Sequence, residues 1–261
     1  MLAWLWGMLL VGGAVFLSIA GTFLVRRWVA VEVLERHNEV AGFIYAVIGV
    51  VYAVLLGFTA IIVWERYDKA QAALEAETND LIDLYRDAEA LPNDIRSEVG
   101  TQIRTYARLV VEKEWPAMAE HKSSPEVWDA YTQLWRTYYQ FQPENERDKI
   151  WYTVSIARLN DLGDQRRERL LSSRLRAVPV IIWVVLLAAG GITIGFSFLF
   201  GMRSVVAQVV MSAGLAITIA LVMLSIMALE QPFSGITRVG PQAFERLEDM
   251  FKRLETTARS H

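Results

Sequence analysis

The chain has 261 residues and no cysteine, which excludes disulfides, thiol nucleophiles and thiolate metal sites. Hydrophobic residues make up 54% of it and charged residues 21%, a composition typical of a membrane protein with a sizeable polar part. The net charge of −3 gives no electrostatic basis for binding nucleic acid. The three histidines, His37, His121 and His261, share no motif, so metal or general-base chemistry at histidine is not indicated.

The first apolar segment runs from Met1 to Val25 without a charged residue. A signal peptide carries Lys or Arg ahead of its apolar core, and here no basic residue precedes Arg26. The segment is long enough to cross a bilayer as a helix. We therefore expect a retained transmembrane helix, followed by a short polar loop from Arg26 to Glu39.

The second apolar segment has no charged residue from Val40 to Trp64. Charges begin at Glu65, but neither Pro nor Gly interrupts the chain until Pro92. This pattern predicts one continuous helix that crosses the membrane and runs on into water.

Two stripes mark the faces of this second span. Small residues recur at helical spacing and allow close packing of helices in lipid: Gly42, Ala46, Gly49, Ala53, Gly57 and Ala60. A mildly polar stripe lies beside it, with Tyr45, Tyr52 and Thr59 seven residues apart. Helix packing would account for both stripes, and the alternative is that the polar stripe lines a water-filled path.

Two further spans are expected close together. The third runs from about Ala177 to Met202 and has Pro179 near its start, where a proline is tolerated. The fourth runs from Val205 to Leu229. Only Arg203 and Ser204 separate them, so we expect an antiparallel hairpin with a very tight turn.

The polar segment 65–176 shows the helical period throughout. We expect its first helix to end at Pro92, and a second to start at Asn93 as N-cap and to stop at Pro116. A third should begin at Ser124–Pro125 and end at Pro143, and a fourth should run from Glu144 to about Arg176. Gly163 is a weak point in the fourth helix, at a cost of roughly 1 kcal/mol relative to Ala.

Glu77 stands out because it lies on the apolar stripe of the first polar helix, between Leu74 and Leu81. A carboxylate there needs a partner, and the candidates on the returning fourth helix are Arg166, Arg167 and Arg169. A functional interpretation makes Glu77 and Asp80 part of a ring of carboxylates that attracts cations to a vestibule. The alternative for the acidic residues of this helix is a solvated face. A Ca²⁺ site has no ligand-loop pattern here.

The tail, residues 230–261, contains Pro232, Gly235, Gly240 and Pro241, which forbid a regular helix at its start. We expect Pro232, Phe233 and Gly235 to dock the tail, with the Phe233 ring buried. A short amphipathic helix should follow from Phe244 to Arg259.

Four spans place both termini and the polar segment on one side. The basic residues near the membrane on that side are Arg66, Lys69, Arg166, Arg167, Arg169, Arg174, Arg176 and Arg238, and those on the other are Arg26, Arg27, Arg36 and Arg203. The positive-inside rule then predicts cytoplasmic termini and a cytoplasmic polar segment. The first span alone, with Arg26 and Arg27 behind it, would favour the opposite orientation.

The expected fold is an all-α integral membrane protein whose inner transmembrane helices extend into a cytoplasmic helical bundle. Its parts are transmembrane helices 1 and 2 in 1–64, the helical domain 65–176, transmembrane helices 3 and 4 in 177–229, and the cytoplasmic tail 230–261.

Several motifs together resemble a bacterial bestrophin-like family of membrane proteins, over nearly the whole chain. They are NEVAGFIYAVIGVVYAVLLGF at 38–58, Glu77 ahead of Leu81 and Leu84–Tyr85, Tyr106 before Glu114–Trp115–Pro116, the Arg167/Arg169 cluster before Pro179 and Trp183, and Pro232–Phe233 with Gly235. Bestrophins are pentameric ion channels with four spans and long helices that reach into the cytoplasm. The resemblance thus implies a five-fold pore lined by the second span, with Tyr45, Gly49, Tyr52, Phe58 and Thr59 as candidates. This chain departs from the pattern because that span lacks a clear cluster of pore-narrowing Phe, and Phe58 is the one candidate there with a small-residue neighbour.

The leading functional hypothesis is a homo-oligomeric ion channel of the inner membrane, a pentamer by this resemblance, that favours cations. Its expected partners are the lipid bilayer, its own copies and inorganic ions. The alternative is a non-conducting membrane scaffold or sensor whose bundle binds a partner. An enzyme is disfavoured because no nucleophile–base pair, phosphate loop or metal cluster is present, and no cofactor is expected. A proton-coupled transporter is disfavoured because the spans lack acidic and basic side chains at membrane depth.

Overall fold

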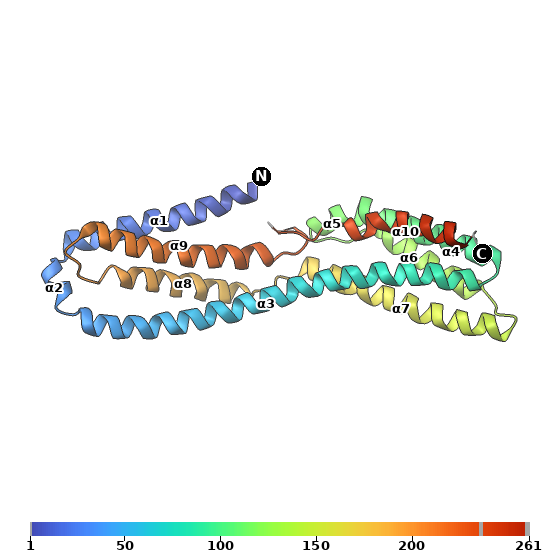
Figure 1. The fold of residues 1–261 in the computed structure, drawn as a ribbon, viewed down its shortest axis with the longest axis horizontal. Helices are drawn as coiled ribbons and strands as arrows, with labels where there is room; N and C mark the ends of the chain where they lie inside the picture. The colour runs from blue at the N-terminus through green and yellow to red at the C-terminus, as the bar shows by residue number, and fades with distance from the viewer. Residues whose placement is uncertain (1, 235–236, 259–261) are drawn as a thin grey trace. The chain divides into compact units, whose positions relative to one another are not determined.

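The computed structural model describes residues 2–234 and 237–258, and all regular structure in these ranges is helical (Figure 1). The α-helices are α1 (Leu2–Trp28), α2 (Val31–Glu35), α3 (Asn38–Asp87), α4 (Asn93–Leu109), α5 (Trp115–Ala119), α6 (Pro125–Gln140), α7 (Glu146–Arg174), α8 (Val180–Ser197), α9 (Val205–Leu229) and α10 (Gln242–Ala258). A 3₁₀ turn, η1 (Ala88–Ala90), follows α3, and a π-helical turn, η2 (Val110–Glu114), joins α4 to α5. The expected all-α class is confirmed.

The described chain forms two compact units. The membrane unit consists of residues 2–66 and 176–230, and the bundle unit consists of residues 67–175, 231–234 and 238–258. The helix α3 is uninterrupted from Asn38 to Asp87 and contributes to both units, as the absence of Pro and Gly after Gly57 predicted.

Four helices of the described chain are long and apolar enough to cross a membrane: α1, α3, α8 and α9. The prediction of four spans is thus confirmed, although the third helix is shorter than expected. It starts at Val180, directly after Pro179, and ends at Ser197. The connection to α9 is therefore residues 198–204, and it is longer than the two-residue turn that we predicted.

Two amide side chains explain why this longer connection is stable. The Gln208 side chain is 2% exposed and donates to the carbonyls of Phe198 and Phe200, at 3.2 and 3.0 Å. The Asn38 side chain donates to the Gly201 carbonyl and accepts from the Gly201 N–H, both at 2.9 Å. These bonds satisfy backbone groups that the end of a helix leaves without partners.

The loop expected at 26–39 is partly helical, because α1 continues to Trp28 and α2 buries Leu34. Gly201 lies against this segment, and a Cβ there would collide with the backbone of Glu35. The close approach therefore requires a glycine at position 201.

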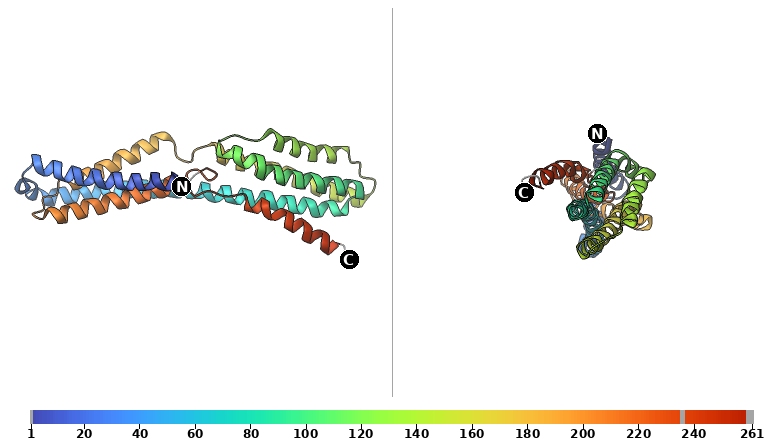
Figure 2. Two further views of the ribbon diagram at one scale, coloured as in Figure 1. Left: turned by 90° about the horizontal axis from the view of Figure 1, so that it is seen from above. Right: turned by 90° about the vertical axis from the view of Figure 1, so that its right-hand side faces the viewer.

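Within the membrane unit, α1 and α9 lie side by side (Figures 1 and 2). The hydroxyls of Thr22 and Ser212 are 3.1 Å apart and both buried. The Arg26 guanidinium at the end of α1 donates to Gln208 Oε1 at 2.7 Å. Thr22, Ser212, Arg26 and Gln208 thus find partners within the unit, as a hydrocarbon environment favours.

The bundle helices begin largely where the caps predicted. The Ser124 hydroxyl accepts from the Val127 N–H, and Pro125 is in the first turn of α6. A second cap was not foreseen, since the Asn145 side chain accepts from the Asp148 N–H at 2.9 Å and starts α7. Asn93 was expected to be the N-cap of α4, but it is the first helical residue and Pro92 occupies the cap position.

The expected stop at Pro116 is wrong. The chain stays helical through η2 and α5 and ends its helix at Ala119. Pro116 is in the first turn of α5, where its missing N–H leaves no hydrogen bond unmade. The π-helical turn before it was not predicted.

The core of the bundle unit contains the apolar stripe of α3. Its apolar positions are all buried: Ala70, Leu74, Leu81, Leu84, Ala88 and Leu91. Facing positions of α4, α6 and α7 complete the core, among them Ile103, Leu134 and Leu159.

The packing of α6 on α7 requires a glycine at position 163, which the sequence did not show. The Tyr131 ring of α6 crosses Gly163 of α7, and its hydroxyl donates to the Leu159 carbonyl at 3.0 Å. A Cβ on residue 163 would collide with the Tyr131 hydroxyl and ring. The low helix propensity of glycine is therefore offset by a close contact between helices.

We expect Gly163→Ala to lower the free energy of unfolding by about 1–3 kcal/mol, because overpacking outweighs the gain in helix propensity. The loss should be smaller in a Tyr131→Phe background, which lacks the colliding hydroxyl. Chemical denaturation of the four proteins of this cycle in detergent measures both values. A Gly163→Ala protein as stable as the parent would contradict the contact.

Candidate functional site

Arg169 of α7 and Glu77 of α3 form a fully buried ion pair. The Arg169 Nε donates to Glu77 Oε2 at 2.6 Å, and Nη2 donates to Glu77 Oε1 at 2.9 Å. Both side chains have an exposed fraction of 0%. This two-point geometry is the strong form of the Arg–carboxylate interaction, and it joins α3 to α7.

Glu114 extends the pair into a network of two carboxylates and two guanidiniums. Arg169 Nη2 also donates to Glu114 Oε2 at 2.8 Å. Arg166 donates to the same carboxylate through Nη2, at 2.5 Å, and Nε, at 3.3 Å. The charges alternate as Glu77, Arg169, Glu114 and Arg166, so this set, which we call the buried network, is electrically neutral.

Two further hydrogen bonds and two aromatic rings complete the surroundings of the ion pair. The Tyr106 hydroxyl donates to Glu77 Oε1 at 2.6 Å, and Arg169 Nη1 donates to the Met118 sulfur at 2.8 Å. The rings of Trp115 and Phe244 each lie 5.6 Å from the Arg169 guanidinium carbon. Arg169 is thus held by hydrogen bonds and cation–π contacts together.

Burial and charge set the protonation states. Burial alone would raise the pKa of Glu114, but Arg169 and Arg166 outweigh it and hold that pKa below its ordinary value. Burial favours a lower pKa for Arg169, but Glu77 and Glu114 raise it. Burial, and then the Glu77 carboxylate, raise the pKa of Tyr106 well above its usual range. Glu114 and Arg169 therefore keep their charges at neutral pH, and Tyr106 keeps its proton.

Sequence reasoning missed Glu114, which we had assigned only to a helix end. Its spacing carried a signal, because Glu114 stands four residues after the buried Val110 and four before the buried Met118. The three candidate arginines behave differently. Arg166 and Arg169 are buried, whereas Arg167 is 62% exposed and pairs with Asp164.

Asp80 lies near the network but is only half-buried. Burial, and then the neighbouring Asp161 carboxylate, raise the pKa of Asp80 to about 6. Arg158 of α7 bonds instead to Asp83, at 3.0 Å. Asp80 thus changes charge close to neutral pH, unlike Glu114 and Arg169 of the network.

The polar stripe of α3 packs within the membrane unit. Tyr45 stacks on Phe196 with ring centroids 5.9 Å apart. Tyr52 is 4% exposed and its hydroxyl lies against Gly190, and the buried Thr59 hydroxyl donates to the Leu55 carbonyl at 2.8 Å. Of the two interpretations of this stripe, helix packing is the one that the geometry favours, because apolar neighbours of the same chain cover it.

Gly49 and Phe58 lie outside the polar stripe of α3. A Cβ on Gly49 or Gly57 would meet no atom within 4 Å, and Phe58 is 65% exposed. The small-residue stripe therefore borders open space in the single chain at Gly49 and Gly57.

The tail residues Pro232 and Phe233 are buried. The Phe233 ring contacts Trp115 edge-on, with centroids 5.6 Å apart, and the Pro232 carbonyl accepts from the Val239 N–H at 2.7 Å. Gly235, the third expected docking residue, lies outside the described residues.

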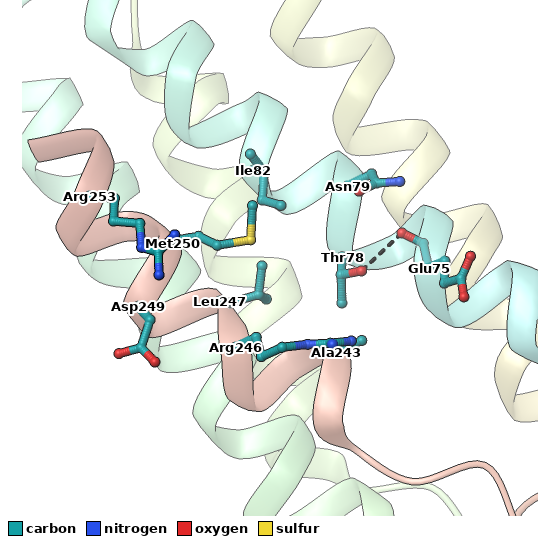
Figure 3. Close-up of a pocket in the computed structure, with 10 residues that line it drawn as sticks. All are labelled: Glu75, Thr78, Asn79, Ile82, Ala243, Arg246, Leu247, Asp249, Met250 and Arg253. Carbon is teal, nitrogen blue, oxygen red and sulfur yellow. Dashed lines mark hydrogen bonds between the residues drawn. The ribbon is translucent and has the colours of Figure 1, made fainter. Parts of the chain in front are cut away.

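Two grooves flank α10 in the bundle unit. One, of about 620 Å³, lies between α3 and α10 and has Ile82 and Leu247 on its walls (Figure 3). The other, of about 590 Å³, lies between α4 and α10. Within residues 2–234 and 237–258, no group of three or more His, Asp or Glu side chains could hold a metal ion.

A comparison with known protein families decides the relationship of this chain. Residues 3–244 match the Bestrophin-like domain. The chain belongs to the Bestrophin-like family. Among curated proteins, no relative matches it.

Solved structures show the same fold for this Bestrophin-like chain. A bacterial bestrophin homologue from Klebsiella pneumoniae is 14% identical, with a TM-score of 0.68 over 92% of this chain and 97% of that one. A variant of the Klebsiella homologue has a TM-score of 0.71 at 14% identity, over 93% and 97% of the two chains. A structure described as a membrane protein is 16% identical, with a TM-score of 0.71 over 93% and 98%. The fold is thus shared over nearly the whole length.

We expect Glu77→Gln to lower the free energy of unfolding by about 3–5 kcal/mol, because it leaves the Arg169 charge buried with one carboxylate fewer. Glu120→Gln is the matched control, since Glu120 pairs with Lys122 at 2.9 Å on the surface and such exposed pairs contribute little to stability. Chemical denaturation in detergent compares them. Equal losses in the two variants would contradict the role of burial.

Proposed function

We propose that this chain is a subunit of a homo-oligomeric ion channel of the inner membrane, with a pore lined by α3. The observation that carries the proposal is the open small-residue face of α3. The Bestrophin-like family and its shared fold agree with it, and the resemblance to bestrophins favours five subunits.

Self-association explains why small residues border open space. In lipid, a stripe of Gly and Ala allows another helix backbone to approach closely, whereas facing acyl chains it has no such use. Gly49 and Gly57 have that free space within their own chain. The neighbouring subunit is therefore the proposed partner of this face.

The path for ions is proposed along the exposed face of α3 that carries Phe58, whereas Gly49 lies on the opposite face and is proposed to pack against the neighbouring subunit. Tyr45, Tyr52 and Thr59 are our weaker candidates, because their side chains pack inside the membrane unit. The span from Val40 to Trp64 carries no charged residue. A channel does not need one there, since carbonyls and apolar constrictions can select and gate.

A preference for cations now depends on Asp80 more than on Glu77. The Glu77 charge is buried and balanced by Arg169, so it would add little to the field of a vestibule. Asp80 is half-buried and has a pKa of about 6. Its carboxylate is mostly charged above that pH, and can then attract cations to a mouth.

One observation favours the alternative of a non-conducting scaffold or sensor. Aromatic rings follow one another along α6, with Trp135 stacked on Tyr139 at 5.4 Å and Tyr131 edge-on to Trp135 at 6.4 Å. Trp128 and Tyr139 are 53% and 70% exposed. Exposed aromatic clusters are typical of protein interaction sites.

Recording from the purified protein in a planar bilayer tests conduction directly. We expect channel currents whose reversal potential in asymmetric KCl shows a preference for K⁺ over Cl⁻. The preference should increase between pH 5 and pH 7, as Asp80 loses its proton, and Asp80→Asn should remove this pH dependence. Silent bilayers at protein levels that contain assembled oligomers would favour the scaffold instead. An unchanged pH profile in Asp80→Asn would remove Asp80 from the mouth.

We expect Gly49→Leu to weaken the oligomer, because a bulky side chain would separate the α3 helices of neighbouring subunits. Gly191→Leu on α8 is the matched control, since its Cβ also meets open space in the chain. Size-exclusion chromatography with light scattering in detergent gives the subunit number of each variant. An intact oligomer in Gly49→Leu would show that the small stripe is not the interface.

The proposed orientation has cytoplasmic termini and a cytoplasmic bundle, from the Arg and Lys distribution. Fusions of a periplasm-active reporter at Ser123 and after His261 should therefore be inactive, and a fusion at Glu32 should be active. A strong signal at Ser123 or His261 would reverse the orientation.

A further inference from the structure

Three polar side chains of the bundle unit are buried without a hydrogen-bond partner among the residues that the structure describes. They are Asp87, at its Oδ2 atom, and the hydroxyls of Tyr138 and Ser155. Asp87 is the last residue of α3 and is 8% exposed, whereas Tyr138 of α6 and Ser155 of α7 are both 0% exposed. A buried polar group without a partner is costly, and native proteins rarely leave one. Three such groups at one place would indicate a bound ligand.

The contact between α3 and α7 places Ser155 beside Asp87. Arg158 Nη1 is 3.0 Å from Asp83 Oδ2, and Arg158 Nε is 3.9 Å from Asp87 Oδ2. Ser155 lies three residues before Arg158, and therefore on the same face of α7. Since the ion pairs between the two helices show that α7 runs antiparallel to α3, this step along α7 leads toward Asp87, at the end of α3.

Tyr138 reaches the same place from α6. Its ring lies 6.4 Å from the ring of Tyr152, which is three residues before Ser155 on α7. Burial is the main cause that raises the pKa of Tyr138 to about 12, while the Ser155 hydroxyl lowers that pKa and the Asp87 charge raises it further. Both groups are thus close enough to act on the Tyr138 hydroxyl, although neither is in hydrogen-bond geometry with it. The three groups therefore converge between α3, α6 and α7.

The surroundings of these three groups carry an excess of negative charge. Besides burial, which is the main cause, the Asp83 charge raises the pKa of both Asp80 and Asp87, and the Asp161 charge raises that of Asp80. Arg158 lowers both pKa values, but its side chain is 40% exposed, and one positive charge does not balance four carboxylates. A bound cation would reduce this imbalance, whereas a neutral water molecule would not.

The donor atoms limit which cation fits. Carboxylate and hydroxyl oxygens suit hard cations. Each hydroxyl can turn a lone pair toward a cation and its hydrogen toward a neighbouring oxygen. One buried carboxylate and two neutral hydroxyls carry too little charge to remove the water from a divalent ion such as Mg²⁺, which dehydrates reluctantly. The set therefore favours a monovalent metal ion.

We propose that Asp87, Tyr138 and Ser155 bind a monovalent cation, Na⁺ or K⁺, which joins the end of α3 to α6 and α7. The ion takes the place of the hydrogen bonds that these three side chains do not make with one another. It is a structural part of the folded bundle and not an ion in transit. Its binding therefore does not depend on whether the chain conducts.

Thermal unfolding of the purified protein in detergent tests this site. We compare NaCl and KCl with N-methyl-D-glucamine chloride at constant ionic strength, because N-methyl-D-glucamine is too large to enter. An ion that binds only the folded protein stabilises it, so we expect a Tm about 2–4 °C higher in Na⁺ or in K⁺. Equal Tm values in the three salts would overturn the proposal and leave a water molecule as the occupant.

Three variants locate the effect. Asp87→Asn keeps the shape of the side chain and removes its charge, so it should abolish the dependence of Tm on the cation. Ser155→Ala removes one ligand and should reduce the shift at least about twofold, and it replaces Asp87→Asn in the test if that protein does not fold. Asp164→Asn is the matched control, since it removes the same charge from α7 at a side chain that is 64% exposed and pairs with Arg167.

The control protein should keep the full shift. A full shift in Asp87→Asn or in Ser155→Ala would place the ion elsewhere and overturn the proposal. Loss of the shift in Asp164→Asn would also overturn it, because the effect would then follow the overall charge and not these three groups.

Discussion

Arg169 has no route to water, so its charge is balanced only by Glu77 and Glu114. Removing a guanidinium from water is costly, and the attraction of buried carboxylates offsets that cost only when the geometry is good. Here both oxygens of each carboxylate accept a hydrogen bond from an arginine. Glu77 comes from α3 and Glu114 from η2. The interaction therefore defines which helices meet and in which register, because a shift of one residue would strand a charge. This specificity matters more than net stability, which an apolar core could also supply.

The two parts of α3 treat their polar side chains alike, although one part lies in the bundle unit and the other in the membrane unit. In the bundle unit its buried face is mostly apolar, and its one fully buried charged side chain, Glu77, has its partners. In the membrane unit its polar groups are turned inward or bonded to its own carbonyls, as Thr59 is to Leu55. What remains is an apolar surface with open space beside Gly49 and Gly57. The Klebsiella homologue shares this fold at 14% identity, so the arrangement does not require the same side chains.

The sequence alone predicts the elements that depend on local interactions. Apolar length predicted the four membrane helices, and the Ser124–Pro125 cap predicted the start of α6. Glu77 could be seen to need a cation, because a carboxylate stood on an apolar stripe. The choice among three arginines could have been narrowed further: Arg166 and Arg169, three residues apart, share a face that Arg167 does not. The tertiary contacts could not be predicted from the sequence. No local pattern shows that Tyr131 crosses Gly163 or that Gln208 bonds to the 198–204 connection.

The wide turn η2 has a consequence for how this part of the chain tolerates changes in length. Tyr106, Val110, Glu114 and Met118 are all fully buried, and each is four residues after the one before. In a regular α-helix three such steps would carry the last side chain about 120° around the axis. The π-helical turn absorbs the surplus and keeps all four on one line. A homologue with one residue deleted between Val110 and Glu114 would have spacings of four, three and four residues, which a regular α-helix keeps on one face, so it could bury all four side chains without the wide turn.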